Sequence, residues 1–394
     1  MNFVINTNVV SPHTVPLTVA LNALHCFESV SYVYTLNSAE RFRTEGEYEK
    51  IKALAIDSTR DHKLSRRISL EADCLMENVR DFDVMEERTR QGKKTIYCSE
   101  RWFKPIRLDS PRNAEYAAGA GLSISGFFKM IFPFAQKRAI RMVRLLKSGS
   151  LLYFPVGIEA ARDMARMCGL LNGDLSCIFR APQLGFENKP GGRIWSENGN
   201  DSQYCLGKMR MWGYFVSSKA KSREREPDHS IKRLKVLWVG RMFSWKRVDT
   251  VIRAVCGLPD VELNIFGTGP EERRLRRIAK AQINVRFHGM VPIDEVREQM
   301  RQHDVYVLSS NAFEGWGAVV NEALEEGMKV VGTFEAGASA TLLPKSNLFH
   351  AGDWKALRTI LQKPIADVSV GEWSASSAAR VLCNLTKEDR DVNE

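Results

Sequence analysis

The second half of the chain alternates short apolar segments with longer amphipathic ones, and this alternation constrains the fold more than any other feature. Short buried strands that alternate with helices pair in parallel, because each helix carries the chain back across a face of the sheet. The pattern therefore predicts an open, doubly wound α/β sheet whose ligands bind outside the carboxyl ends of its strands. The predicted strands are 235–240, 261–266, 285–288, 305–308 and 329–332, and the predicted helices are 247–257, 271–281, 294–303 and 318–326.

The first half shows a less regular version of the same alternation, which predicts a second α/β layer. The predicted strands there are 1–10, 31–36, 95–98, 151–156 and 211–216, and the predicted helices are 15–26 and 158–170. Residues 184–201 are rich in Gly, Asn, Ser and Pro and are predicted to form a surface loop.

At 394 residues the chain is too long for one ordinary hydrophobic core, so we expect two domains. The polar and strongly charged segment 217–233 is predicted to be a linker between a first domain, 1–216, and a second domain, 234–358. Residues 359–394 are expected to form a C-terminal helical segment.

The composition, with 44% hydrophobic and 26% charged residues, is that of a soluble globular protein, and no apolar run reaches the ~18 residues of a membrane-spanning helix. The first residues have no basic region typical of a signal peptide, so none is expected. The eight cysteines are scattered, which argues against a zinc site and a disulfide framework and favours the reducing cytoplasm. The net charge of +10 predicts an anionic partner, namely nucleic acid, a membrane surface or a phosphorylated ligand.

The segment 313–322 carries two carboxylates, Glu314 in a glycine-broken loop and Glu322 in the helix that follows. A carboxylate accepts hydrogen bonds from sugar hydroxyls. The backbone N–H groups of Gly315, Trp316 and Gly317 precede the helix, and a helix N-terminus attracts phosphate. Glu322 falls outside the apolar stripe of the helix, so we expect it to face a cleft. The alternative, a solvated Glu on an exposed flank of the helix, stays open for this segment alone.

Two further loops follow predicted strands. Arg241 and Lys246 flank one strand-to-helix turn, where they can neutralise a diphosphate. Gly267, Thr268 and Gly269 form the other, and its glycines permit close approach of a ligand to the backbone. Solvated surface cations and a tight turn without a ligand are the alternatives for each loop taken alone.

In order and spacing, the three loops together resemble the retaining glycosyltransferases of family four. The resemblance covers residues 234–358 and includes Gly337 and Ala338 beyond the next strand. In the first half, segments 11–13, 97–101 and 212–215 look like a subgroup found in bacterial surface-polysaccharide clusters.

This resemblance implies a GT-B fold, in which two Rossmann-like doubly wound domains face each other across a cleft. The first domain would be the acceptor side, the second would bind the donor nucleotide, and the last helix would cross back to the first domain. As catalytic residues, Arg241 and Lys246 would hold the donor diphosphate and Glu314 would contact the donor sugar. Glu322 would contact the ribose, and the backbone after Glu314 would cap phosphate.

The resemblance implies no metal and no cofactor beyond the donor, because two cations and a helix N-terminus already supply the countercharge. An Asp-x-Asp spacing occurs at Asp81 and Asp83, but within a charged and helical run. The implied activity is a hexosyltransferase-type transfer from a nucleoside-diphosphate sugar, with retention, to a glycan or lipid-linked glycan acceptor. The alternatives are a nucleotide-sugar epimerase of the same fold and, from another class, a basic nucleic-acid-binding protein, for which no recognition motif is present.

The acceptor side departs from the family pattern. The first loop holds His13 between two prolines where the family usually carries a glycine pair, and prolines remove N–H donors that could meet phosphate. Ser99, Glu100 and Arg101 follow a predicted strand and are candidates for orienting the acceptor, although Glu100 and Arg101 are equally consistent with a structural ion pair.

The stretch from 116 to 158 contains no acidic residue and many basic ones beside aromatic side chains. A basic amphipathic helix with adjacent aromatics suits the inner face of an anionic plasma membrane, and a core helix with a solvated basic side is the alternative. The basic residues of this candidate surface are Lys129, Lys137, Arg138, Arg141, Arg144 and Lys147.

Overall fold

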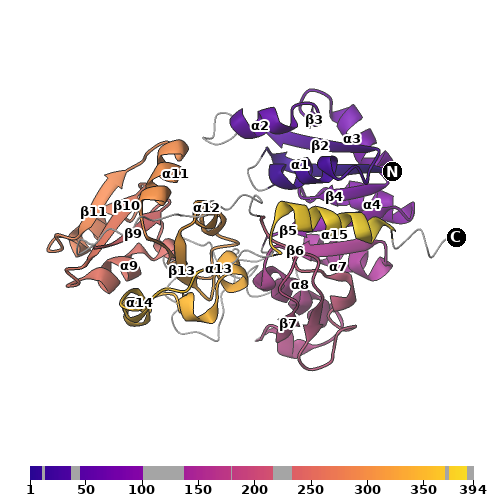
Figure 1. Ribbon diagram of the computed structural model, residues 1–394. Helices are drawn as coiled ribbons and strands as arrows, with labels where there is room; N and C mark the ends of the chain where they lie inside the picture. The colour runs from indigo at the N-terminus through magenta and orange to yellow at the C-terminus, as the bar shows by residue number, and fades with distance from the viewer. Residues whose placement is uncertain are drawn as a thin grey trace. The chain divides into compact units, whose positions relative to one another are not determined.

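The structure, a computed structural model, describes residues 1–10, 14–36, 45–100, 137–178, 180–215, 233–368 and 372–387. The chain divides into two compact units (Figure 1). The first unit is Met1–Phe215 together with Glu372–Glu394, and the second is Val216–Gly371. The predicted linker falls almost wholly outside the described residues.

A parallel sheet of six strands, in the order β3-β2-β1-β4-β5-β6, forms the centre of the first unit. The strands are β1 Asn2–Val9, β2 Ser29–Leu36, β3 Ala55–Asp57, β4 Cys74–Glu77, β5 Lys94–Ser99 and β6 Leu151–Pro155. The strand order reverses between β1 and β4, which pair with Asn6 opposite Glu77. Loops that leave neighbouring strands at such a reversal diverge to opposite faces and leave a crevice at the carboxyl edge.

Helices follow the strands of the first unit, and side chains cap several of them. The Asp61 carboxylate accepts a hydrogen bond from Leu64 N at 2.8 Å, and Asp81 accepts one from Val84 N at 3.0 Å, so each begins a helix. The helices are α1 Val15–Ala23, α2 Glu45–Ile51, α3 His62–Glu71, α4 Phe82–Arg90, α7 Lys137–Ser148 and α8 Ile158–Leu171, with short turns η3 Leu175–Ile178 and η4 Leu206–Lys208.

Two predictions for the first unit were wrong. The segment predicted as a surface loop contains an antiparallel pair, β7 Leu184–Phe186 and β8 Ile194–Ser196. The segment predicted as a closing strand at 211–216 makes only an isolated bridge from Trp212 to Val156. Its apolar side chains serve packing instead, because the Trp212 ring lies 4.8 Å from the rings of both Phe154 and Phe215.

The helix α15, Ala375–Lys387, belongs to the first unit, where it packs against α1. The Lys94 ammonium donates to the carbonyl of Leu385, and a disulfide joins Cys26 to Cys383, whose Cα atoms are 6.2 Å apart. The cysteine spacing predicted no disulfide framework, and this one bridge departs from that prediction. Spacing along the chain does not reveal a pair of cysteines that are brought together only when the last helix returns to the first unit.

The second unit repeats the same strand order, β11-β10-β9-β12-β13-β14. Its strands are β9 Leu234–Val239, β10 Val261–Phe266, β11 Val285–Gly289, β12 Val305–Leu308, β13 Lys329–Thr333 and β14 Leu348–Phe349. Its helices are α9 Val248–Val255, α10 Glu272–Ile278, α11 Ile293–Gln302, α12 Val319–Glu325, α13 Gly337–Leu342 and α14 Trp354–Leu361, with turns η5 Ser244–Lys246 and η6 Lys345–Asn347. The reversal here lies between β9 and β12.

The predicted boundary of the second domain at residue 358 falls inside α14. This helix packs on α9, and the Arg358 guanidinium donates to the carbonyls of Ala254 at 2.9 Å and Arg253 at 3.0 Å. The second unit accordingly continues to Gly371. Its core joins Trp238 and Ile265 of neighbouring strands with apolar residues of α9 and α14.

The basic helix α7 turns its apolar side, including Met142 and Val143, into the first unit. On its other side, Arg141 contacts Glu86 and Asp83 of α4, each at 2.7 Å. Other residues of the first unit already cover the apolar side of α7, so this side cannot insert into a bilayer. Any attraction of α7 to a membrane would therefore come from its basic side chains. Lys129, assigned to the same candidate surface, lies outside the described residues. None of the helices in the described ranges is both long and apolar enough to cross a membrane.

Candidate functional site

Lys246 and Glu314 form an ion pair at the carboxyl edge of the second sheet, where the loops after β9 and β12 meet. Their side chains are 20% and 15% exposed, so the pair is largely shielded from water yet reachable. The Ser310 hydroxyl donates to Oε2 of Glu314 at 2.7 Å, and Glu314 N donates to the carbonyl of Asn311 at 2.9 Å. A cation and a carboxylate that are 68 positions apart are thus held together at the strand reversal.

Hydrogen bonds between the two loops fix this arrangement. The Ser309 hydroxyl donates to the carbonyl of Lys246 at 2.6 Å, and Asn311 N donates to the carbonyl of Trp245 at 2.8 Å. The indole N–H of buried Trp238 donates to the Ser309 hydroxyl at 3.3 Å. Because these bonds come from the backbone and from buried side chains, they position Lys246 without help from a ligand.

Arg241 lies on an aromatic stack. Its guanidinium carbon is 4.8 Å from the centroid of the Phe243 ring, which is itself stacked on Trp245 at 4.3 Å. Arg241 is exposed. A guanidinium held this way keeps its N–H donors available at its edge, because the aromatic ring contacts only its face.

Gly267 and Gly269 occupy a tight contact with the loop after β9. A Cβ atom on Gly267, whose φ is +120°, would lie 1.9 Å from the carbonyl oxygen of Gly240, and one on Gly269 would lie 2.6 Å from Met242 N. Met242 N donates to the carbonyl of Thr268 at 2.9 Å. The close backbone approach predicted for a ligand is therefore made by the protein itself, which explains both glycines without a ligand.

The loop 315–317 is fastened to the start of α13. Gly337 N donates to the carbonyl of Gly315 at 3.1 Å, and Ala338 N donates to that of Trp316 at 2.8 Å. The Trp316 side chain is fully buried and donates to Oδ1 of Asn321 at 2.7 Å. Trp316 is therefore a core residue, and a role in ligand binding is left only to its backbone, as predicted. Gly317 has φ +88°, a conformation that favours glycine.

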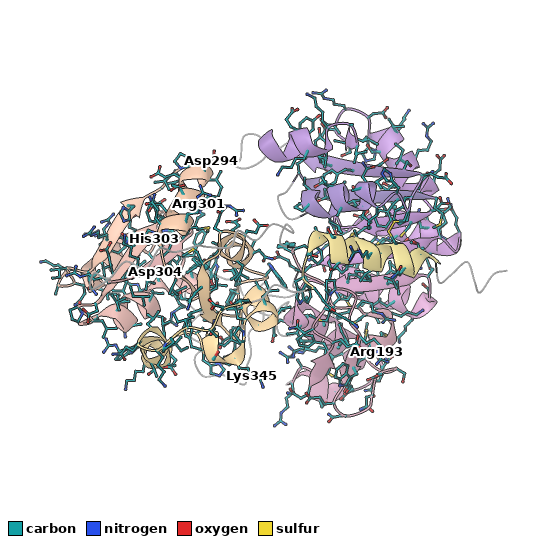
Figure 2. All side chains as sticks on the ribbon, viewed as in Figure 1. Arg193, Asp294, Arg301, His303, Asp304 and Lys345 are labelled. Atoms are coloured by element: carbon teal, nitrogen blue, oxygen red, sulfur yellow. A yellow bond between two sulfur atoms is a disulfide. The ribbon has the colours of Figure 1, made fainter. Side chains whose placement is uncertain are left out.

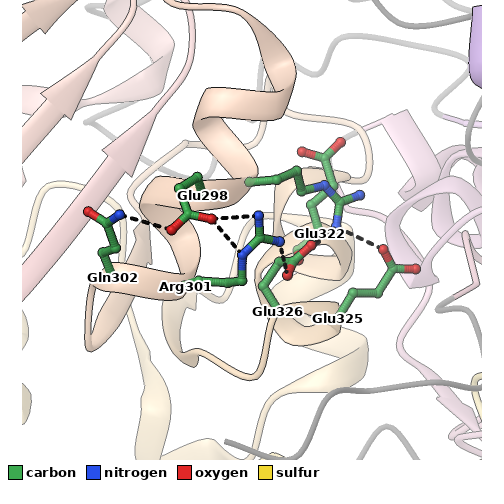
Figure 3. A network of polar contacts seen from close by, with 7 residues as sticks. Glu298, Arg301, Gln302, Glu322, Glu325 and Glu326 are labelled. Atoms are coloured by element: carbon green, nitrogen blue, oxygen red, sulfur yellow. Dashed lines mark hydrogen bonds and ion pairs between the residues drawn. The ribbon is translucent and has the colours of Figure 1, made fainter.

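Glu322 was expected to face an open cleft. That expectation was wrong, because its side chain is buried and only 4% exposed. α11 packs over this side of α12, and Arg297 donates to the carbonyl of Glu322 at 3.3 Å and to Glu325 at 2.9 Å. Burial lowers the pKa of Arg297, but the carboxylates of Glu322, Glu325 and Glu326 outweigh it and raise that pKa. Figure 3 shows this network, which continues from Glu326 through Arg301 to Glu298.

Sequence reasoning missed Tyr306, in the middle of β12. Its side chain is fully buried, and among the described residues its hydroxyl has no hydrogen-bond partner. Burial, and then the carboxylates of Glu314 and Glu322, raise the pKa of Tyr306 well above its ordinary value, so the phenol stays neutral. Tyr306 therefore lies within electrostatic reach of both carboxylates. In the sequence it is one residue of an apolar run, and no signal there separates it from a core residue.

The first unit carries a cavity of about 460 Å³ at the carboxyl ends of β1, β4 and β5. Ser99 and Glu100, two of the acceptor-side candidates, line it. The Tyr214 hydroxyl donates to Glu100 at 2.5 Å, and the Ser99 and Tyr153 hydroxyls are 3.3 Å apart. Glu100 is thus held by Tyr214. The other two acceptor-side candidates, His13 and Arg101, lie outside the described residues.

Arg80 is a second lining residue of this cavity that the sequence did not single out. Its backbone is left-handed, with φ +65°, and its Nε donates to the Tyr97 hydroxyl at 3.1 Å. A non-glycine residue in this conformation costs about 1 kcal/mol or more, and such residues cluster at functional sites. We therefore add Arg80 to the acceptor-side candidates.

Glu77 lies beneath this turn, at the strand reversal. Asn6 Nδ2 donates to its Oε2 at 2.8 Å, and Val79 N donates to its Oε1 at 2.6 Å. Burial raises the pKa of Glu77 to about 8. The second of these bonds is to Val79, the residue just before Arg80. Glu77 therefore helps to fix the backbone that forms this side of the cavity.

The Asp-x-Asp spacing has structural explanations, because Asp81 caps α4 and Asp83 pairs with Arg141. Within the described part of the chain, no cluster of three or more His, Cys, Asp or Glu side chains is arranged to hold a metal ion. Figure 2 shows the described side chains of both units and labels Arg193 in the first unit and Asp294 and Lys345 in the second.

Comparison with known proteins bears on both units. Residues 221–368 match the sequence family described as Glycosyl transferases group 1. A lipopolysaccharide core biosynthesis glycosyltransferase of Rhizobium meliloti, LpsE, is 31% identical over 140 residues, which are 34% of this chain and 40% of LpsE. The chain spans less than half the length of three curated relatives that it matches, between 31% and 46%.

Two solved structures resemble the whole chain. The lipopolysaccharide outer core galactosyltransferase WaaB, in its apo form, has a TM-score of 0.56 at 12% identity and covers 99% of this chain and 100% of its own. HepE from Anabaena, in complex with UDP, has a TM-score of 0.56 at 13% identity and covers 100% and 99%. These likenesses confirm the predicted GT-B fold with two Rossmann-like domains. The residues that match the group 1 glycosyl transferase family, 221–368, lie within the second unit.

Proposed function

We propose that the protein is a retaining glycosyltransferase that moves a hexose from a nucleoside-diphosphate sugar to a glycan or lipid-linked glycan acceptor in bacterial surface-polysaccharide synthesis. The observation that carries the proposal is the Lys246–Glu314 pair, held between two loops at the strand reversal of the group 1 domain. LpsE and WaaB, which act on lipopolysaccharide by their names, support the acceptor class.

Lys246 and Arg241 would supply the positive charge that a departing nucleoside diphosphate needs. A leaving diphosphate gains negative charge as the bond to the sugar breaks, so cations held nearby stabilise the transition state more than the ground state. Lys246 is held by backbone bonds and Arg241 by its aromatic stack, so little reorganisation is needed when the donor binds. These two cations would make a metal ion unnecessary, and the donor is the only small molecule that the reaction needs.

Glu314 would exchange its pairing with Lys246 for hydrogen bonds from the donor sugar hydroxyls, while Ser310 keeps the carboxylate in place. Glu322 would accept hydrogen bonds from the ribose after a local rearrangement that exposes its carboxylate, because its side chain is only 4% exposed. The backbone of 315–317 would cap phosphate. Gly267, Thr268 and Gly269 would shape the donor site indirectly, through their contact with the loop that bears Arg241.

The acceptor would enter the cavity of the first unit, with Ser99, Glu100 and Arg80 around its reacting hydroxyl. Glu100 would accept a hydrogen bond from that hydroxyl in place of the one from Tyr214. Same-face attack with retention requires mainly that the hydroxyl be positioned next to the breaking bond and that the leaving group be stabilised. His13 and Arg101 are retained as acceptor-side candidates on the sequence pattern alone.

The test begins with thermal unfolding in the presence of UDP, GDP or ADP. A nucleotide at 100 times its Kd stabilises the folded state by about 2.7 kcal/mol, which raises the melting temperature measurably. The nucleotide that stabilises then identifies the donor series for transfer assays with radiolabelled sugar, run with and without EDTA. An anomeric proton spectrum of the product reports retention. If none of the three nucleotides shifts the melting temperature, the proposed function is wrong.

A further inference from the structure

The antiparallel pair β7–β8 presents a tryptophan to solvent. Trp195 is the central residue of β8, and its side chain is 42% exposed, while Ile194 and Ser196 on either side of it are buried. Alternate residues of a strand point to opposite faces, so this Trp lies on the outer face of the pair. A large aromatic side chain on an outer face forgoes the burial that Trp usually achieves, and such exposure marks a binding surface when it lies beside groups that recognise a ligand.

A glycine supports the indole ring. Gly185 of β7 pairs with Trp195, and a Cβ atom on Gly185 would lie 2.5 Å from Cε2, 2.5 Å from Nε1 and 2.7 Å from Cζ2 of the indole. Three ring atoms at nearly equal distances indicate a ring that lies face-on over the glycine. The missing side chain therefore lets the indole rest on the backbone of β7, with its opposite face turned outward.

Two recesses adjoin this platform. Trp195 lines one of about 470 Å³, whose lining includes apolar Ile194 and Leu206. Its polar and charged lining residues are Arg193, Asp201, Ser202 and Arg210. A wider, open recess shares Ser202 and has a lining of amides and hydroxyls. Its amide and phenol side chains come from Asn172, Asn198, Asn200, Gln203 and Tyr204. Figure 2 labels Arg193 on this part of the first unit.

Hydrogen bonds hold the recess in shape. Asp201 Oδ1 accepts from Ser196 N at 2.7 Å, which fixes the loop after β8 to the strand. The Tyr204 hydroxyl donates to Asp174 Oδ2 at 2.8 Å, and Asn172 Nδ2 donates to the carbonyl of Gln203 at 2.5 Å. A preformed surface of this kind loses little conformational entropy when a ligand binds.

A flat aromatic face beside amide and hydroxyl groups matches the chemistry of a sugar ring. A pyranose has a face of C–H groups, whose partial positive charge suits the negative face of an indole, and a rim of hydroxyls that donate and accept hydrogen bonds. An apolar peptide or a lipid chain would require a continuous apolar groove, whereas the open recess beside Ser202 is lined by amides and hydroxyls. A nucleic acid would require cations directed to phosphate. Here Arg193 pairs with Glu187 at 3.2 Å, and Arg210 donates to the carbonyls of Gly207 and Met209.

We propose that the outer face of β7–β8 and the adjoining recesses bind a hydroxyl-rich oligosaccharide, with Trp195 as the stacking platform. This surface shares no lining residue with the cavity of about 460 Å³ at the strand ends. It goes beyond the proposed transfer reaction and depends on no donor residue. In a glycosyltransferase it would hold a part of the glycan acceptor that does not react, which raises the residence time of long acceptors relative to short ones.

The test is isothermal titration of the full chain, without nucleotide, with hexasaccharides of glucose, mannose, galactose, N-acetylglucosamine and glucuronic acid. At least one is expected to bind the wild-type protein. Trp195→Ala is expected to weaken that binding about fivefold or more, which corresponds to the loss of one stacked aromatic contact, whereas Trp195→Phe keeps most of it. Gly185→Ala, which pushes the indole off its support, is expected to weaken binding like Trp195→Ala.

Ile283→Ala is the matched control, because it removes an exposed apolar side chain of the other unit, and it is expected to bind like the wild type. Equal melting temperatures of these variants and the wild type establish that each is folded. Binding of none of the five hexasaccharides, or binding that Trp195→Ala leaves unchanged, overturns the proposal. A change of oligomeric state or of vesicle binding in Trp195→Ala without a change in oligosaccharide binding also overturns it. Nucleotide-induced stabilisation is measured on the same samples, so the proposed donor function and the proposed oligosaccharide site are tested independently.

Discussion

The Lys246–Glu314 pair makes the most discriminating prediction about this protein, because an ion pair can serve either stability or catalysis. We expect Lys246→Ala and Glu314→Ala, and the isosteric Glu314→Gln, to abolish sugar transfer while the protein stays folded. Removal of one donor that stabilises a developing charge lowers kcat about 10²–10³-fold. Lys246→Ala is further expected to lose most of the stabilisation by nucleotide, and Glu314→Gln to keep it, since of these two residues only Lys246 would contact the diphosphate.

The cost to stability follows from the exposure of the pair. Breaking a fully buried ion pair by removing one partner costs about 3–5 kcal/mol, and an exposed pair contributes about 0–1 kcal/mol. Lys246 and Glu314 are 20% and 15% exposed, which places the pair between these limits. We therefore expect each single variant to lose about 1–3 kcal/mol of the free energy of unfolding. The double variant Lys246→Met/Glu314→Gln should recover part of this loss, because neither charge is then left alone.

The assays are urea unfolding and transfer kinetics, both at a temperature where every variant is more than nine-tenths folded. Arg276→Met is the control, because it breaks the Arg276–Glu272 pair, at 2.9 Å on α10 of the same unit, outside the donor loops. It should alter stability slightly and leave kcat unchanged. Wild-type turnover in folded Lys246→Ala or Glu314→Ala would refute the assignment. So would a loss of activity that merely follows the unfolded fraction.

Further predictions concern the rest of the chain. Tyr306→Phe removes a buried hydroxyl without a partner among the described residues, so the free energy of unfolding should stay within about 1 kcal/mol of the wild type or rise; a larger loss would show that the hydroxyl is satisfied. The folded protein keeps the Glu77 proton up to pH about 8, whereas the unfolded chain releases it near pH 4.5. Stability from this group is therefore present below pH 4.5 and lost as pH rises toward 8, and Glu77→Gln should flatten that part of a urea-unfolding pH profile, whereas an unchanged slope would contradict the pKa. Cys26→Ser removes the link to α15 and should cost about 2–5 kcal/mol in urea unfolding under oxidising conditions, with no difference from the wild type once both are reduced. Charge reversal of Arg138 and Arg144, which leaves the apolar side of α7 buried, should abolish flotation with acidic liposomes if the basic surface binds a membrane, and unchanged flotation would remove α7 from that role.

The donor half could be predicted well because its signals are local. Strands β10 and β12 have the predicted bounds. Strands β9, β11 and β13 differ from their predicted bounds by one residue at one end or both, and β14 was not predicted. Apolar alternation and turn residues act over neighbouring positions, so a window of sequence contains the relevant physics. The first half has shorter signals. β4 is only four residues, and the β7–β8 pair lies within a stretch dominated by loop formers.

The sequence by itself determined two things: the presence of two parallel α/β sheets, and the cations, glycines and carboxylates that stand at the ends of particular strands. What only the tertiary structure decided is which of those groups meet. Glu322 lies off the apolar stripe of its own helix but is buried, because α12 is packed among β12, β13, α11 and α13. Cys26 and Cys383 are 357 positions apart and become partners only when α15 returns to the first unit. Periodicity is a property of one segment of sequence. The burial and pairing of a side chain depend on which other segments pack against its own, and those segments are far apart in the chain.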